Sequence, residues 1–266
     1  MRPEWLRVVA QDDGPAVVYL YGLIGEDWWG DGNAAIDFAK ALDELGSRDL
    51  ELRVNSEGGS VFEGYAMYSA LNRYPGKVTA YVDGLAASAA SYLILAADEV
   101  VMGAASFFMI HNAWAGACFA GNAKEWTEFA ADVASRLQML DKQIVDIYEG
   151  HCEKSREDIE SAMEATTWLT AEQTVEWGFA SRIDEGLKAA ACISPEAAKM
   201  FGSVPDGIDI GDKAPTVTAN TEPVDMVEGP EQELVVEQAQ ERQPMTIGEV
   251  MSLSYRTSSR KEEPDA

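Results

Sequence analysis

One serine and one histidine could together perform nucleophilic chemistry in this chain. Ser88 lies in the small-residue stretch GLAASAASYLILAA (84–97), and a helix starting there would surround it with backbone N–H groups that stabilise an oxyanion. A serine nucleophile needs a base, and the chain has two histidines. His111 ends the apolar run 107–110, whereas His151 lies in a polar stretch typical of the surface. The pattern favours Ser88 as nucleophile and His111 as general base.

Two backbone amides are predicted to hold the oxyanion. One belongs to Ala89, directly after the nucleophile, and the other to Gly59 in NSEGGSV (55–61), where adjacent glycines can adopt conformations closed to other residues. With Gly58 and Ser60, the same loop can line a groove in which an extended peptide binds as an added strand. Taken singly, a tightly packed core helix also explains the first stretch, and an ordinary tight turn explains the second.

No cofactor or metal site is predicted. Residues 59–64 have the G-x₄-G spacing of a phosphate loop, but Tyr65 stands where that loop needs a lysine. Residues 30–35 mimic a dinucleotide pattern, but no clean apolar strand precedes them and nearby carboxylates would repel a pyrophosphate. The three cysteines are scattered without a C-x₂-C pair, so we expect reduced thiols and no zinc; they are Cys118, Cys152 and Cys192.

Charge and the N-terminal sequence limit the partners and the location. A formal net charge of −26 disfavours nucleic acid and anionic membranes, because both would repel this surface. The first residues lack the apolar run and cleavage site of a signal peptide. We therefore expect a cytoplasmic protein.

The elements that must position the site alternate between strand and helix. We expect strands at 16–22, 50–54, 77–82, 98–102 and 107–110. We expect helices from a cap at Asn33 to Leu45, at 60–74, over 84–97, and from Asn122 to Glu149. The last helix carries an apolar stripe from Trp126 to Tyr148, typical of a core or a subunit interface. The alternation predicts an α/β fold with parallel crossovers.

The sequence changes character near residue 200. Residues 203–266 hold a single aromatic, Tyr255, six of the ten prolines, and 14 acidic against 5 basic side chains. Such a composition buries too little apolar area to offset chain entropy. We predict a folded domain over 1–200 and a disordered, acidic, proline-rich tail over 201–266.

The order of these motifs resembles the Clp peptidase family. The matching segments are NSEGGSV (55–61), GLAAS (84–88), MIH (109–111), WLTAEQ (168–173) and WGFA (177–180). The resemblance covers roughly residues 16 to 185. It implies a ClpP/crotonase-like fold of repeated β-β-α units with a long protruding helix, homo-oligomeric rings that stack into a closed chamber, and a peptide or protein substrate.

The resemblance also assigns roles, and the sequence departs from it at two positions. In the family, residues matching Ser88 and His111 are nucleophile and base, and those matching Gly59 and Ala89 form the oxyanion hole. The family's catalytic aspartate falls on Thr166, which cannot supply a charge.

Several groups could replace that aspartate. Glu164 is the candidate third member; Asp158 and Glu160 are more remote options, and a Ser–His dyad oriented by a hydroxyl is another. In the glycine loop, Glu57 takes the place of the family's proline, which is expected to alter the substrate groove.

Within the family, EDWWG (26–30), ATTWLTAEQ (165–173) and the acidic tail resemble Clp-related head maturation proteases of tailed bacteriophages. That resemblance implies an ATP-independent serine endopeptidase that processes capsid and scaffold proteins in an assembling prohead of the host cytoplasm, with the tail as a scaffold-like or self-cleaved segment. Alternatives are a chaperone-associated Clp peptidase of a bacterial cytoplasm, a crotonase-type acyl-CoA enzyme, and a catalytically weak capsid-assembly scaffold protein.

Overall fold

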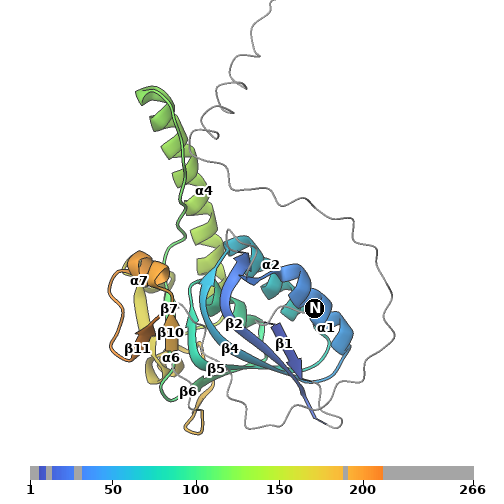
Figure 1. The fold of residues 1–266 in the computed structure, drawn as a ribbon. Coiled ribbons are helices and arrows are strands. Elements are labelled where there is room, and N and C mark those ends of the chain that lie inside the picture. Colours follow the sequence, from blue (N-terminus) through green and yellow to red (C-terminus); the bar gives the residue numbers. More distant parts are fainter. Residues whose placement is uncertain (1–5, 10–13, 27–31, 188–190, 212–266) are drawn as a thin grey trace, which may run out of the picture. The chain divides into compact units, whose positions relative to one another are not determined.

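The computed structural model of the chain describes residues 6–9, 14–26, 32–187 and 191–211. Of the disordered tail predicted over 201–266, residues 212–266 lie outside these ranges, whereas the prediction is wrong for 201–211, which include the end of a helix and a short strand. Figure 1 shows the elements in chain order. The strands are β1 (Leu6–Val9), β2 (Ala16–Glu26), β3 (Gly32–Asn33), β4 (Leu50–Gly59), β5 (Val78–Ala87), β6 (Glu99–Gly103), β7 (Phe107–Ile110), β8 (Thr167–Thr170), β9 (Arg182–Asp184), β10 (Ala191–Ile193) and β11 (Ile208–Ile210). The helices are α1 (Ala35–Leu45), α2 (Val61–Asn72), α3 (Ala89–Leu93), the 3₁₀ helix η1 (Ile94–Ala96), α4 (Ala123–Glu149), α5 (Arg156–Glu164), α6 (Ala171–Trp177) and α7 (Pro195–Phe201).

Nine of the described strands form one sheet. Its order is β1-β2-β4-β5-β6-β9, with β3 beside β2, β7 beside β5 and β8 beside β7. The neighbours from β2 to β9 pair parallel, as do β5 and β7, whereas β1, β3 and β8 pair antiparallel. Because the carboxyl ends of adjacent parallel strands meet at one edge, the ends of β4 and β5 lie side by side. This is the edge where the glycine loop and the serine were predicted to meet.

Strand β5 runs further than predicted and changes its neighbour on the way. Residues 79–82 pair with β6, whereas residues 85–87 pair with β7. The predicted helix over 84–97 is therefore wrong for its first residues, and α3 begins only at Ala89. A short run of small buried residues suits a strand covered on both faces as well as it suits a helix, and pairing with β7 selects the strand.

The main apolar core lies between the sheet and α1, α2 and α3. Alternate residues of the central strands point into it, because side chains alternate across a strand. They include Val18, Leu20, Leu52, Val54, Ala80 and Val82. Phe38 from α1 and Met67 from α2 are fully buried in the same cluster. Burial of each large apolar side chain contributes about 1.5–3 kcal/mol, which fixes the strands that carry the site.

Two helix starts differ in how they are capped. The predicted cap at Asn33 is wrong: that residue lies in β3, and the Glu63 carboxylate from α2 instead accepts a hydrogen bond from the backbone N–H of Ala35 (2.6 Å). The start of α4 is as predicted, because Asn122 and Glu125 form a reciprocal capping box. A contact 28 residues away in sequence replaced the local cap in the first case.

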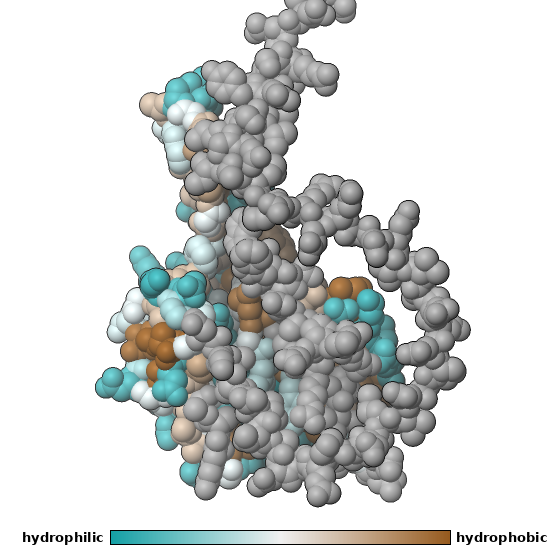
Figure 2. Space-filling view, in the orientation of Figure 1, coloured by the Kyte–Doolittle hydropathy of each residue, from teal (hydrophilic) through white to brown (hydrophobic). Residues whose placement is uncertain are grey.

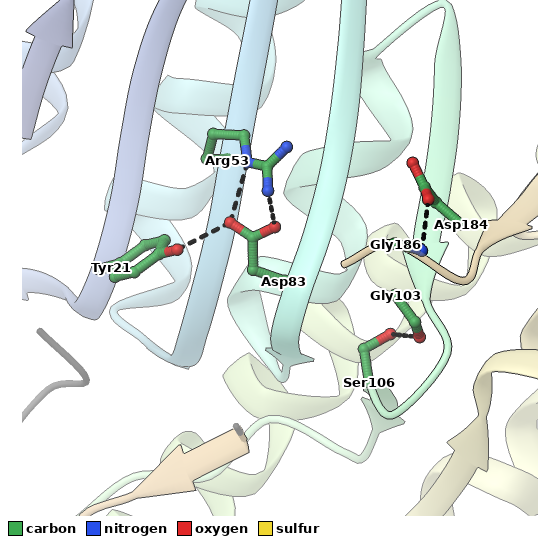
Figure 3. A network of polar contacts seen from close by, with 7 residues as sticks. All are labelled: Tyr21, Arg53, Asp83, Gly103, Ser106, Asp184 and Gly186. Carbon is green, nitrogen blue, oxygen red and sulfur yellow. Dashed lines mark hydrogen bonds and ion pairs between the residues drawn. The ribbon is translucent and has the colours of Figure 1, made fainter. Parts of the chain in front are cut away.

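A buried ion pair ties β2, β4 and β5 together just before their functional ends (Figure 3). The Asp83 side chain is 3% exposed and accepts hydrogen bonds from Tyr21 Oη (2.7 Å) and from both Nε (3.0 Å) and Nη2 of Arg53. Burial raises the pKa of Asp83, and its two partners oppose that shift. Removing one member of such a pair costs about 3–5 kcal/mol, because the other charge is then left buried alone.

Helix α4 projects away from the sheet (Figure 1). Its buried residues are Ile144, Val145 and Tyr148, all near its carboxyl end, whereas Trp126 is 45% exposed. The apolar stripe therefore enters the core only over its last turns. No helix within the described ranges is both long and apolar enough to cross a lipid bilayer.

Candidate active site

Ser88 lies in a strained turn between β5 and α3. Its φ of 53° falls in the left-handed region, which side chains rarely adopt outside functional or tight-turn positions. The Ser88 N–H donates to the carbonyl of Met109 on β7 (2.9 Å), so the turn is held by the neighbouring strand. Ser88 stands at the N-cap position of α3, as the sequence predicted, with its hydroxyl unused in capping.

The structure brings the predicted serine and histidine together. His111 follows β7, and its Nε2 lies 2.7 Å from Ser88 Oγ. Burial lowers the pKa of His111 to about 4, so the imidazole is neutral at pH 7 and can accept the serine proton. His151 is exposed on the surface, as predicted.

The glycine loop packs directly against the serine turn. A Cβ at Gly58 would lie 2.6 Å from both the carbonyl oxygen of Ala87 and the Cβ of Ser88, and 2.8 Å from the nitrogen of Ala89. Gly58 has a φ of 90°, so both its conformation and its surroundings exclude a side chain. Gly59 follows at the exposed end of β4. The glycine loop is therefore in contact, through Gly58, with the turn that carries Ser88 and Ala89, whereas Gly59 itself lies against Ile24 of β2.

Three side chains that the sequence did not single out fix this backbone. Ser91 donates its N–H (3.0 Å) and its hydroxyl (2.5 Å) to the Ser88 carbonyl, and its hydroxyl also bonds with the Tyr148 hydroxyl from α4 (2.6 Å). Ser56 Oγ accepts from the Gly58 N–H at 3.1 Å. The i, i+3 spacing of Ser91 from Ser88 could have indicated the first contact, whereas the sequence marked Tyr148 only as the end of an apolar stripe.

Within the described residues, no hydrogen bond or ion pair joins the predicted third member, Glu164, to His111. Glu164 is exposed at the end of α5 and lines a surface pocket with Asn112 and Asp141. Asp158 accepts a hydrogen bond from Ser155. Burial is the cause of the His111 pKa shift, with no contribution from a carboxylate.

The other remote option is also engaged elsewhere. Glu160 pairs with Arg156 at 3.8 Å. Within the described ranges, the Nδ1 atom of His111 has no hydrogen-bond partner. A carboxylate contact equivalent to that of a Ser–His–Asp triad is therefore missing from the described residues.

Thr166 and His111 each lie one residue beyond the ladder of β7 and β8. The last pair of this antiparallel ladder is Ile110 opposite Thr167, so a continuation of its register would place Thr166 opposite His111. The φ of Thr166 is 52°, an outlying value for a β-branched residue. The backbone thus holds a left-handed conformation that aspartate or asparagine tolerates better than threonine does.

Comparison with known proteins agrees with this geometry. The family model described as Clp protease matches residues 33–186. The chain is 35% identical over 128 residues to the ATP-dependent Clp protease proteolytic subunit 1 of Chlamydia abortus, covering 47% of this chain and 65% of the relative. It is 31% identical over 140 residues to the ATP-dependent Clp protease proteolytic subunit of Porphyromonas gingivalis, covering 52% of this chain and 60% of the relative. The chain thus spans less than two thirds of the length of either relative.

A solved structure agrees at the level of the fold. A mutant of ClpP1 from Listeria monocytogenes superposes with a TM-score of 0.51 at 25% identity, covering 63% of this chain and 92% of that one. The α/β ClpP-like fold with a long helix, predicted from the sequence, is therefore confirmed.

We predict that Thr166→Asp will accelerate the reaction of Ser88 with a fluorophosphonate probe. The substitution puts a carboxylate opposite His111, where it can orient the imidazole and raise its pKa, and it relieves the strain of a β-branched residue at positive φ. We expect a gain of about tenfold or more in labelling rate. Thr166→Asn is the matched control, because it relieves the strain without adding charge. Equal rates for both variants would contradict the prediction.

We predict that Gly58→Ala will abolish probe labelling of Ser88. The added Cβ meets the Ala87 carbonyl and the Ser88 side chain at 2.6 Å, so the serine turn must move. Gly46→Ala is the control, because Gly46 also has a positive φ (65°) but its added methyl group would have nothing within 4 Å. The control should lose only about 1 kcal/mol of stability and label normally. Normal labelling of Gly58→Ala would show that the reactivity of Ser88 does not depend on the close approach of the Gly58 backbone.

Proposed function

Because the chain belongs to the Clp protease family, we propose that it is a serine-type endopeptidase whose reaction depends on Ser88 and His111. The observation that carries the proposal is the 2.7 Å contact between His111 Nε2 and Ser88 Oγ at the meeting point of three strand ends. A buried neutral imidazole bonded to a serine hydroxyl on a strained turn is the arrangement that nucleophilic catalysis requires.

The proposed reaction proceeds through an acyl-enzyme. Ser88 Oγ attacks the peptide carbonyl while its proton passes to His111 Nε2. The tetrahedral intermediate breaks down when His111 returns that proton to the leaving amine. A water molecule, deprotonated by the same nitrogen, then attacks the ester, and His111 returns that proton to Ser88 Oγ as the acid is released.

The oxyanion is proposed to bind to the N–H groups of Gly59 and Ala89. Ala89 is the first residue of α3, and the first amides of a helix have no intrahelical partner. The Ser60 N–H donates to the carbonyl of Ile24 on the β2 side (2.7 Å). Gly59 is proposed as the second donor because Gly58, the residue before it, packs against Ser88 and the nitrogen of Ala89. We propose that these two amides converge beside Ser88 Oγ.

The substrate is proposed to be an extended peptide that adds as a strand beside the end of β4. Gly58 leaves no side chain at the serine, and Ser60 caps α2 at the far end of the same segment. Main-chain pairing of this kind accepts many sequences, which suits a peptidase acting on unfolded or tethered protein.

The setting of this activity has two candidates. The relatives named above are proteolytic subunits of ATP-dependent proteases, which favours a chaperone-associated peptidase of a bacterial cytoplasm. Neither of the two relatives named above is a prohead protease, and processing of capsid and scaffold proteins is supported by the EDWWG and ATTWLTAEQ segments and the acidic tail. Peptide hydrolysis at Ser88 itself needs no nucleotide, since its steps involve only the serine, histidine and backbone amides.

We predict that Ser88→Ala will abolish both fluorophosphonate labelling and cleavage of a fluorogenic peptide without ATP, and that His111→Gln will slow labelling by about 10⁴-fold. Ser161→Ala, at an exposed serine of α5, is the control and should retain full activity.

With a His111 pKa of about 4, labelling at pH 5 should keep about 90% of its rate at pH 7, because the imidazole remains neutral. An ordinary histidine would be almost fully protonated at pH 5.

Other outcomes would identify the alternatives. Thioester hydrolysis by Ser88→Ala on an acyl-CoA substrate, with no peptide cleavage by the wild type, would favour a crotonase-type enzyme. An unreactive Ser88 in the folded wild type would favour an assembly protein. Co-expression with capsid proteins tests the prohead hypothesis, which fails if Ser88→Ala leaves capsid processing unchanged.

We further propose that α4 mediates self-association into homo-oligomers. The exposed part of the helix carries Trp126, which packs edge-on against Phe119 and Phe129 with ring centroids 5.1 and 6.2 Å apart. Sedimentation velocity should find oligomers for the wild type and smaller species for Trp126→Glu. Lys124→Glu, at an 83% exposed side chain in the first turn of the same helix, is the control. A monomeric wild type would contradict the proposal.

A further inference from the structure

Residues 191–211 form a small element that follows the family-matched part of the chain. We call this element, made of β10, α7 and β11, the C-terminal module. Its two strands pair parallel with each other and not with the main sheet. Figure 1 shows it beside β7 and β5, and Figure 2 shows hydrophobic surface in this region, where Ile210 is 56% exposed.

The module covers the face of the sheet opposite the main core, directly under the catalytic pair. Side chains alternate across a strand, so Leu85 and Ala87 point away from the face that Ala86 occupies. They form a second apolar cluster with Met109 and with side chains of the module. The module contributes Ala191, Ile193, Ala197, Phe201 and Ile208. Two of the covered residues, Ala87 and Met109, precede Ser88 and His111 by one and two positions.

One side chain of the module touches the catalytic histidine itself. The ring of Phe201 lies edge-on to the His111 imidazole, with centroids 5.3 Å apart and planes at 73°. Phe201 is 5% exposed, and Trp168 from β8 also lies edge-on to it, with ring centroids 5.9 Å apart. The imidazole thus contacts a serine hydroxyl and an aromatic ring that itself packs against a second aromatic ring.

The module is tied to the glycine loop at the position where the sequence departs from the family. Glu57 accepts hydrogen bonds from both the N–H (2.7 Å) and the hydroxyl (2.9 Å) of Ser194, the N-cap residue of α7. A carboxylate at this place also interacts favourably with the positive end of the helix dipole. Glu57 thus links β4, two residues before Gly59, to the helix that carries Phe201.

We propose that Phe201 is a positioning residue that holds the His111 imidazole toward Ser88 by packing, in place of the aspartate that Thr166 has replaced. The inference rests on the proposed function, since positioning matters only if His111 is the base. Packing fixes the plane of the ring, and orienting the imidazole is one of the tasks that a carboxylate performs in a Ser–His–Asp triad.

Charged groups around His111 do not account for its lowered pKa. Charged residues on neighbouring segments are Glu57 in the glycine loop, Glu196 and Lys199 on α7, and Asp141 and Glu164, which line a pocket with Asn112. Glu57 is bound to Ser194, Asp141 accepts the N–H of Ala113 (2.6 Å), and the other three side chains are exposed. The segments β7, β8 and α3 carry no charged side chain.

The test uses the full chain and follows the two histidines by NMR between pH 5 and 8. In the wild type His111 should stay neutral throughout, because its pKa of about 4 lies below this range, while exposed His151 serves as the internal reference. In Phe201→Ala the His111 signal should titrate within the range, and the Ser88 labelling rate at pH 7 should fall by about tenfold to a hundredfold. Phe201→Leu should retain most of the wild-type behaviour, and Met200→Ala, an exposed neighbour, should retain all of it.

Glu57→Ala provides a second test if Phe201→Ala does not fold. Loss of a negative charge alone would lower the pKa of His111, whereas a loosened module would expose the ring and raise it. A raised value supports the proposal. An unchanged or lowered value, or a folded Phe201→Ala with wild-type titration and labelling, overturns it. A wild type that neither labels nor cleaves would refute the proposed function. The titration of His111 can still be measured in such a protein, so its pKa in the wild type and the variants tests the role of Phe201 separately.

Discussion

The site depends on one close approach between two backbones, that of Gly58 at the end of β4 and that of the Ser88 turn at the end of β5. No Cβ fits between them, since one placed on Gly58 would lie 2.6 Å from Ser88 Cβ. The approach requires β4 to extend past its regular pairing, and the register of β4 with β5 shifts between Val54 and Ser56. The Asp83–Arg53 ion pair holds these strands just before they deviate. Packing of the regular part of the sheet thus supports the irregular ends of β4 and β5, where the proposed reaction takes place.

The chemical part of this arrangement could be predicted from the sequence, because it depends on rare residue types. With two histidines in the chain, a base for Ser88 had few candidates, and His111 follows a clear apolar strand. The exact course of β5 could not be predicted. Residues 84–87 are buried and, apart from Leu85, small, and they satisfy a helix or a buried strand equally well. Their partner β7 lies about twenty residues later in the chain. Pairing with this distant strand, and not the local pattern, therefore determines that these residues form a strand.

The contacts that support His111 could not be predicted from the sequence either, because they join residues that are far apart in the chain. Glu57 and Ser194 are 137 residues apart, and Phe201 lies beyond the part of the chain that matches the family. The sequence showed only two departures, Glu57 for a proline and Thr166 for an aspartate. In the structure Glu57 anchors the module whose Phe201 touches His111, while Thr166 keeps the left-handed backbone without the charge. Both departures from the family pattern, at Glu57 and Thr166, thus affect the surroundings of the His111 imidazole.

Replacing a carboxylate by aromatic packing has a definite chemical consequence. A catalytic imidazole must be oriented, must be neutral before attack, and must be stable as a cation once it holds the serine proton. Burial against Phe201 serves the first two needs but opposes the third, because a low-dielectric environment disfavours the imidazolium. The transition state therefore carries a charge that no described side chain balances. Such a site suits a peptidase whose substrate is held beside it, since a high local concentration offsets slow proton transfer.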